Sequence, residues 1–169
     1  MCQHQFRRLT GALFMLMSVW CISPPASASC IGLGCSCSVS ATDLAFGIYD
    51  PFSASNSDSV GNIEVSCGAF VLGATISYEI RLSTGSSGTY AARTLTSGGS
   101  SIAYNLYTDA GRSQVWGDAS GSTNSVSDGY LLSLIKNRSE DYSVYGRIPG
   151  SQNVPAGSYT DSIVVTVIF

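Results

Sequence analysis

The sequence contains a single histidine, His4, and charged residues make up only 11% of the chain. A Ser-His-Asp triad, a Cys-His pair and a histidine-ligated zinc site all require imidazole. His4 lies in an N-terminal segment that we interpret below as a leader, so the remaining chain is left without these sites. The carboxylates show no EF-hand or other ligand spacing. We therefore assign no catalytic residue, no metal and no cofactor, and we expect a protein that is not an enzyme.

The N-terminal segment has the three parts of a secretory signal peptide. Arg7 and Arg8 precede an apolar run over residues 9–22, and the small residues Ala26-Ser27-Ala28 follow it. A helix across that run would be about 21 Å long, which is short of a hydrocarbon core about 30 Å thick. We therefore predict a signal peptide over residues 1–28 and a mature domain over residues 29–169, with no membrane span after cleavage. An uncleaved anchor is the minor alternative.

The mature chain would be acidic and small. Without Arg7 and Arg8, six Lys and Arg face eleven Asp and Glu, so the net charge moves from −3 to −5. Nucleic acid is a poor partner for such a surface. A length of about 140 residues buries one core, so we expect one domain. Four cysteines remain in an oxidising compartment, which favours disulfides.

Short runs of alternating apolar and polar residues recur along the mature chain. The strongest covers residues 75–82, and similar runs cover residues 61–67, 102–106 and 142–148. This alternation is typical of half-buried strands. Gly- and Ser-rich clusters over residues 83–88, 97–101 and 119–129 separate the runs. Further turn signals are Asp50-Pro51, Asp109-Ala110-Gly111 and Pro155-Ala156-Gly157. Residues 130–136 are mostly apolar and fit either a short helix or a buried strand, of which we favour the strand. The pattern predicts an all-β, Greek-key sandwich.

The last expected strand, residues 163–169, is apolar on both faces. One face carries Ile163, Val165, Val167 and Phe169, and the other carries Val164 and Ile168. A strand of this kind usually has a neighbour along each edge. No later segment supplies one, so either an earlier segment or another polypeptide pairs with it. Pattern alone also allows an ordinary internal strand of a complete sandwich.

Seven motifs in order resemble those of the spore coat protein U domain family, which includes the subunits of archaic chaperone–usher pili. They lie at Cys37–Val39 with Phe46–Pro51, at Gly61–Cys67, at Tyr104–Asp109, at Val115–Asp118, at Tyr145–Pro149, at Ala156–Asp161 and at Val165–Phe169. The resemblance covers nearly the whole mature chain.

The resemblance implies an incomplete immunoglobulin-like sandwich that lacks its last strand and exposes a groove along the C-terminal strand. Ile163, Val165, Val167 and Phe169 would line that groove. A periplasmic chaperone would lend it a strand, and a neighbouring pilus subunit would replace that strand at an outer-membrane usher. This is β-strand addition. The protein would pass through the periplasm to the cell surface.

The family also implies a Cys37–Cys67 disulfide, which would leave Cys30 and Cys35 to pair with each other. The residues alone leave three connectivities open. The sequence departs from the pilin pattern between the expected cleavage site and Cys37, where only residues 29–36 remain. Ile31 and Leu33 alternate with glycines and could form only a very short donor strand. A subunit that accepts a strand without donating one would occupy the tip or end of a fibre.

Aromatic and acidic side chains suggest a more remote function, a secreted carbohydrate-binding module. The aromatic candidates are Tyr104, Tyr107, Trp116, Tyr142 and Tyr145, and the acidic ones are Asp109, Asp118, Glu140, Asp141 and Asp161. Core packing and turn capping explain them more simply. The leading hypothesis is therefore a pilus or fimbrial subunit that contributes to surface adhesion or biofilm. The main alternative is a self-complete coat or surface-matrix protein.

Overall fold

The computed structural model describes residues 30–31, 34–70, 73–132 and 137–169. The expected signal peptide, residues 1–28, lies outside the described residues, as do Leu33 and the end of the 130–136 run. The described strands are β1 (Cys30–Ile31), β2 (Ser36–Ala41), β3 (Ser57–Gly68), β4 (Ala74–Leu82), β5 (Arg93–Ser97), β6 (Ser100–Tyr107), β7 (Val126–Leu132), β8 (Asn137–Ile148) and β9 (Val165–Ile168). One short 3₁₀ helix, η1 (Gly85–Ser87), follows β4.

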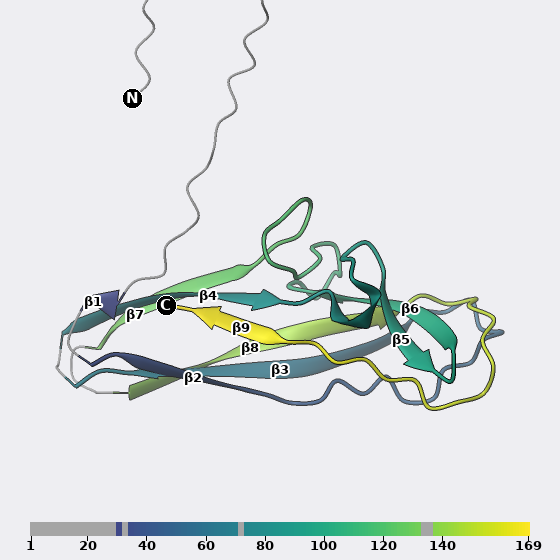
Figure 1. Ribbon diagram of the computed structural model, residues 1–169, viewed down its shortest axis with the longest axis horizontal. Helices are drawn as coiled ribbons and strands as arrows, with labels where there is room; N and C mark the ends of the chain where they lie inside the picture. Colours follow the sequence, from purple (N-terminus) through teal and green to yellow (C-terminus); the bar gives the residue numbers. More distant parts are fainter. Residues whose placement is uncertain (1–29, 32–33, 71–72, 133–136) are drawn as a thin grey trace, which may run out of the picture.

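Two antiparallel sheets form a sandwich, which confirms the expected all-β class. One sheet has β4 at its centre, with β7 along one edge and β1 and β9 along the other. The second sheet has the order β2-β3-β8-β6-β5. Figure 1 shows the two layers, with β4 and β7 above β2, β3 and β8, and with β9 running between them at the side of the sandwich. Among the described residues, no helix is long and apolar enough to cross a bilayer.

The core forms where the alternating strands turn their apolar faces toward each other. β4 contributes every second residue, and β3 and β6 face it with the same period. Side chains of a strand alternate between the two faces of its sheet, so this pattern buries one face of each layer. The buried set comprises Ile63, Val65, Cys67, Ala69, Ala74, Ile76, Tyr78, Ile80, Leu82, Ile102, Tyr104, Leu106, Trp116, Leu132, Val144 and Ile148.

Several strand limits differ from the sequence expectation. Residues 126–129, assigned to a Gly- and Ser-rich connection, are the first half of β7 and pair with β4. The cluster at residues 97–101 contains only a Gly98-Gly99 turn, because β5 ends at Ser97 and β6 begins at Ser100. Both glycines have positive φ, which a tight hairpin turn needs. Tertiary pairing therefore overrides the weak local propensity of these polar residues.

Arg93 on β5 is fully buried and ties three segments together. Its guanidinium donates to the Ser83 carbonyl from both Nε (3.0 Å) and Nη2 (2.7 Å), to the Trp116 carbonyl (2.7 Å) and to Asn105 Oδ1 (2.7 Å). A buried polar group must find partners, and four hydrogen bonds satisfy this one. Because it holds Ser83, Arg93 also fixes the end of β4, where the chain before β9 is attached.

Candidate functional site

The free edge of β9 is the first element of the site. Ser83 N–H donates to the Val164 carbonyl (3.0 Å), and Val164 N–H donates to Ser83 Oγ (2.9 Å), so residue 164 faces β4. Backbone groups alternate between the two edges of a strand. Ile163, Val165 and Val167 therefore direct their N–H and C=O groups away from β4, where no described strand pairs with them.

The free edge of β2, in the other sheet, is the second element of the site. Thr42 N–H donates to the Asn62 carbonyl (2.9 Å), and Asn62 N–H donates to Thr42 Oγ1 (2.9 Å). The same alternation turns the backbone groups of Val39, Ala41 and Asp43 outward. Among the described strands, β2 pairs only with β3. Two unpaired edges, one from each sheet, therefore flank the same side of the sandwich.

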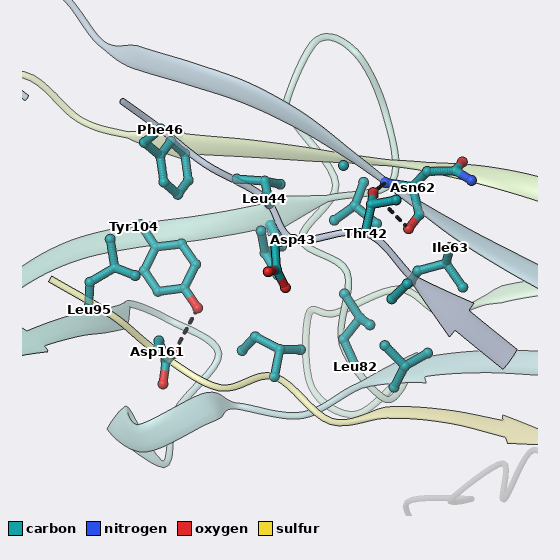
Figure 2. A pocket seen from close by; sticks show the side chains of 16 residues that line it. Thr42, Asp43, Leu44, Phe46, Asn62, Ile63, Leu82, Leu95, Tyr104 and Asp161 are labelled. Carbon is teal, nitrogen blue, oxygen red and sulfur yellow. Dashed lines mark hydrogen bonds between the residues drawn. The ribbon is translucent and has the colours of Figure 1, made fainter. Parts of the chain in front are cut away.

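A mostly apolar hollow of about 190 Å³ lies between these edges, and we call it the edge groove. It is lined by Ala41, Thr42, Asp43, Leu44, Phe46, Gly61, Asn62, Ile63, Leu82, Leu95, Tyr104, Leu106, Val144, Asp161, Ile163 and Val165. Figure 2 shows Leu44 and Phe46 on one wall, with Leu95 and Tyr104 across from them. A second hollow, lined mainly by residues 44–49, 51 and 154–159, shares Leu44, Phe46 and Leu95 with it.

One polar pair interrupts the apolar lining. Tyr104 O–H donates to Asp161 Oδ2 (2.7 Å), and Asp161 Oδ1 accepts from the backbone N–H groups of Ser86 and Ser162 (both 2.9 Å). Burial, together with this carboxylate, raises the pKa of Tyr104 above its usual value. Asp161 thus fixes the segment before β9 against η1, and Tyr104 stays protonated beside it.

The residues expected to line a groove occupy different places. Ile163 and Val165 line it directly. Val167 packs against the core opposite Ile80. Phe169 lies beyond the end of β9 and is 44% exposed. On the other face, Val164 is 63% exposed, so β9 and its approach are not buried on both sides in this chain.

Sequence reasoning named only one wall of the edge groove. The opposite wall comes from Ala41, which ends β2, and from residues 42–44 and 46, which follow β2 without forming a strand of their own. The apolar alternation of Leu44, Phe46 and Ile48 was the available signal for it. Leu95 was also missed, because β5 carries too few apolar residues to show a period.

The four cysteines among the described residues form two disulfides. Cys37 and Cys67 face each other across β2 and β3, with their Cα atoms 4.1 Å apart. Cys30 pairs with Cys35, at a Cα separation of 6.4 Å. Ile31, one residue of the short segment considered as a donor, pairs with Thr75 of its own sheet and is 72% exposed. Leu33, the other residue, lies outside the described residues.

The aromatic and acidic candidates do not gather into a binding platform. Trp116 and Tyr104 are buried in the core, and Trp116 donates through Nε1 to the Ile80 carbonyl (3.1 Å). Asp109 accepts from the backbone N–H groups of Ser113 and Gln114, which holds a turn and lowers the pKa of Asp109.

The remaining acidic candidates serve similar local roles. Asp118 accepts from Ser120 N–H (3.0 Å), Glu140 pairs with Arg138, and Asp141 accepts from Asn62 Nδ2 (2.6 Å). The described part of the chain contains no group of three or more His, Cys, Asp or Glu residues that could hold a metal ion. The other aromatic candidates, Tyr107, Tyr142 and Tyr145, are half-buried.

Comparison with known proteins gives three similarities. The family model described as "Spore Coat Protein U domain" matches residues 27–166. Protein U of Myxococcus xanthus is 30% identical over 134 residues, which cover 75% of this chain and 71% of that protein. A chain of the CsuC–CsuE chaperone–tip adhesion subunit complex, from the archaic chaperone–usher Csu pili of Acinetobacter baumannii, matches with a TM-score of 0.52 at 19% identity. That match covers 80% of this chain and 40% of the solved chain, and it establishes a similar fold.

Proposed function

Because the chain belongs to the Spore Coat Protein U domain family, we propose that it is an exported subunit of a chaperone–usher pilus, whose edge groove accepts a β-strand from another polypeptide. The observation that carries this proposal is that the outer edges of β9 and β2, which no other described strand occupies, flank the same apolar hollow. An unprotected edge over exposed core is unusual in a stable monomer, because it offers a template for pairing.

The groove has the two components of β-strand addition. The outward N–H and C=O groups of Ile163, Val165 and Val167 would bond to the main chain of the added strand, each bond contributing roughly 0.5–1.5 kcal/mol. The side chains of the same residues lie on the inner face, so every second side chain of the added strand would enter the hollow. Main-chain bonds supply affinity and alternate side chains supply register.

The partners proposed for the groove are those that the family implies. A periplasmic chaperone would supply the strand during folding, and the N-terminal extension of a neighbouring subunit would replace it at an outer-membrane usher. The signal peptide expected over residues 1–28 would deliver the chain to that compartment. The solved relative is itself in a pre-assembly complex of a chaperone and a tip subunit, which supports the first of these partners.

A position at the tip of the fibre is supported by the short N-terminal segment. Cys30 and Ile31 pair with β4, and the Cys30–Cys35 disulfide holds them to the start of β2. A segment bound to its own sheet in this way is not free to enter a neighbour. The subunit therefore accepts a strand and donates none, which suits the end of a fibre that no further subunit follows.

The exposed apolar residues at one end of the sandwich support a role in adhesion. Ile31, Phe70 and Leu131 are 72%, 79% and 56% exposed. Figure 1 shows that β1, the end of β3 and the end of β7 gather at the left end of the molecule. An extension that pairs antiparallel to β9 would leave the groove at the opposite end, so the next subunit would lie there. The apolar end would then point away from the fibre, toward the surface that the pilus binds.

A self-complemented variant tests the strand-acceptor proposal. A strand of alternating Val and Thr is fused after Phe169 through a short Asn- and Gly-containing turn. We expect the fused strand to raise the free energy of unfolding by about 3 kcal/mol or more, measured by urea denaturation, because it pairs with the free edge of β9 and covers the groove. The matched control inserts one additional Thr before the strand, which turns its apolar face outward and should remove most of the gain.

A domain that is stable without an added strand would contradict the proposal. An exported, oxidised domain that is a stable two-state monomer alone, and that gains nothing from the fused strand, would have no groove to fill. That result would favour the alternative of a self-complete coat or surface-matrix protein, which the name of the family and the similarity to Protein U make a specific candidate. Cell fractionation would then place the protein on the surface without fibres.

A further inference from the structure

The sandwich has a second side with unpaired strand edges, away from the edge groove. β7 lies along the edge of β4 opposite to β9, and among the described strands it pairs only with β4. In the other sheet, β6 pairs with β8 only at residues 145–147, so the same edge of residues 137–144 has no described partner. Each sheet therefore offers a second edge to which a strand could be added.

Side chains from both sheets meet between these two edges. Tyr142 O–H on β8 donates to Asp128 Oδ2 on β7 (2.6 Å), and the hydroxyls of Tyr142 and Tyr78 are 2.5 Å apart. Because the one hydroxyl proton of Tyr142 is directed to Asp128, the donor of the second bond is Tyr78, which is buried on β4. Asp128 Oδ1 also accepts from the backbone N–H of Gly129 (2.7 Å). Burial, together with the hydrogen bond to Asp128, raises the pKa of Tyr142, so Tyr142 remains a donor.

A second contact joins the same two strands. Tyr130 O–H on β7 donates to the backbone carbonyl of Arg138 on β8 (2.9 Å). The Cζ atom of Arg138 lies 4.9 Å from the centroid of the Tyr130 ring, and Arg138 Nε donates to Glu140. We call the whole set the polar seam, and it comprises Tyr78, Asp128, Tyr130, Arg138, Glu140 and Tyr142.

The polar seam differs from the edge groove in what connects its two walls. Side-chain hydrogen bonds join β7 to β8, whereas none joins β9 to β2 within the described part of the chain. Asp43 and Asp161 line the edge groove but do not bridge these two strands. A strand that entered the seam would displace Tyr142, the partner that Asp128 and the buried Tyr78 share. Covering a polar group or a charge that has lost its partner is unfavourable.

We infer that the polar seam excludes an added strand from this second side, so that each subunit accepts one strand, in the edge groove. The inference rests on the proposed function and assigns specificity to residues outside the groove. Asp128 is the central residue, because it bonds the main chain of β7 and, through Tyr142, holds β8. A linear fibre requires this selectivity, since a subunit that accepted strands on both sides would branch or aggregate.

The number of peptides bound per chain tests the inference. The probe is an acetylated eight-residue peptide in which Val alternates with Thr and Ser, labelled with a fluorophore and titrated into the exported, oxidised protein. The wild type should bind one peptide. The double variant Asp128→Val/Tyr142→Phe removes the central charge and its hydrogen bond while keeping residues that favour strands, and it should bind two.

Asp141→Val is the matched control. It removes the same charge from the position next to Tyr142, but Asp141 lies on the opposite face of β8, because successive side chains of a strand alternate. This variant should bind one peptide, as the wild type does. If the double variant does not fold, Asp128→Val alone takes its place with the same expected number of two.

Hydrogen exchange shows which edge the peptide occupies. In the wild type, saturating peptide should slow the exchange of β9 amides at least tenfold and leave those of β7 unchanged, whereas β7 should also be protected in the double variant. A dimer that protects β7 in the double variant alone would support the inference equally, because a second copy then occupies that edge. Protection of β7 in the wild type would overturn the inference without recourse to any variant.

The stoichiometries also separate this inference from the proposed function. If the wild type and the folded double variant each bind one peptide, at β9, only the inference fails. If the wild type binds none and the double variant binds one, at β7, the proposed function fails and the inference stands. If neither protein binds the peptide, both fail.

Discussion

Replacing Val165 by Thr should affect the binding of an added strand to the edge groove more than it affects the stability of the free chain. Val165 lies opposite Leu82 and lines the groove, half-buried in the free chain. Thr has nearly the same shape and the same preference for strands, but it carries a hydroxyl. Water can reach that hydroxyl while the groove is open. A strand that covers the groove would remove the water without offering a partner.

The expected effect follows from the cost of burying an unpaired hydroxyl, about 1–3 kcal/mol. At 1.4 kcal/mol per factor of ten, Val165→Thr should weaken the binding of an alternating Val/Thr peptide by roughly 5- to 150-fold. The free energy of unfolding of the free chain should change less, because the groove is hydrated in that state. Fluorescence titration measures the first quantity and urea denaturation measures the second.

Val164→Thr is the matched control, since residue 164 is adjacent in sequence but 63% exposed on the outer face. Its hydroxyl stays in water whether or not a strand is bound, so the dissociation constant should change by less than about twofold. The reasoning would be refuted if Val165→Thr weakened peptide binding no more than Val164→Thr does. An equal loss from both variants would mean that the added strand does not lie over the inner face of β9.

Three further predictions concern the framework that holds the groove. Replacing Cys37 and Cys67 by Ala should lower the free energy of unfolding by about 3–4 kcal/mol in urea, because the bond closes a loop of 30 residues; a loss under about 1 kcal/mol would contradict this. Arg93→Lys should cost about 3 kcal/mol or more, because a single ammonium cannot serve the three acceptors that Arg93 reaches, and a thermal melt unchanged from wild type would count against that role. The hydrogen bond from Arg147 lowers the pKa of Asp58, so this pair should stabilise the fold above the unfolded pKa of about 3.9, and that stability should be lost as pH falls through the lower folded pKa. Urea midpoints measured between pH 6 and pH 2 should therefore fall less steeply with acid for Asp58→Asn than for the wild type. An identical slope would show that the pair does not contribute.

The long alternating strands could be predicted from the sequence because one face of each is buried. β4 carries Ile76, Tyr78, Ile80 and Leu82 at every second position, and this period is present in no other regular structure. The final strand could be predicted for the same reason. Its unpaired edge was predicted from the resemblance and from the apolar residues on both faces of the strand. One of those residues, Val164, is exposed in the structure.

The elements that escaped prediction are those whose structure depends on distant partners. β5 has one large apolar residue, Leu95, and its buried side chain is a cation, Arg93, whose three acceptors come from three other segments. The first half of β7 reads as a polar connection and becomes a strand only because β4 pairs with it. The second wall of the groove, residues 41–46, comes close to residues 161–165 through the topology and not through any local pattern.

The disulfides show the same limit. A Cys30–Cys35 bond was one of the connectivities that the sequence left open. The spacing of the cysteines does not indicate that the bond connects β1 to the residue just before β2, a strand of the other sheet. That fact depends on β1 pairing with β4 while β2 pairs with β3. The covalent link near the start of β2 therefore could not be derived from the sequence.

The alternation along β9 has a consequence for assembly errors. Ile163 and Val165 present their main-chain groups to the free edge and their side chains to the hollow, so the two kinds of contact are made by the same residues. A strand that enters one residue out of step keeps its hydrogen bonds but turns its polar face inward. Such a complex would dissociate quickly, while the correct one persists. The dissociation rate of an added strand would then depend on its register, and a strand in the correct register would exchange slowly with competing strands.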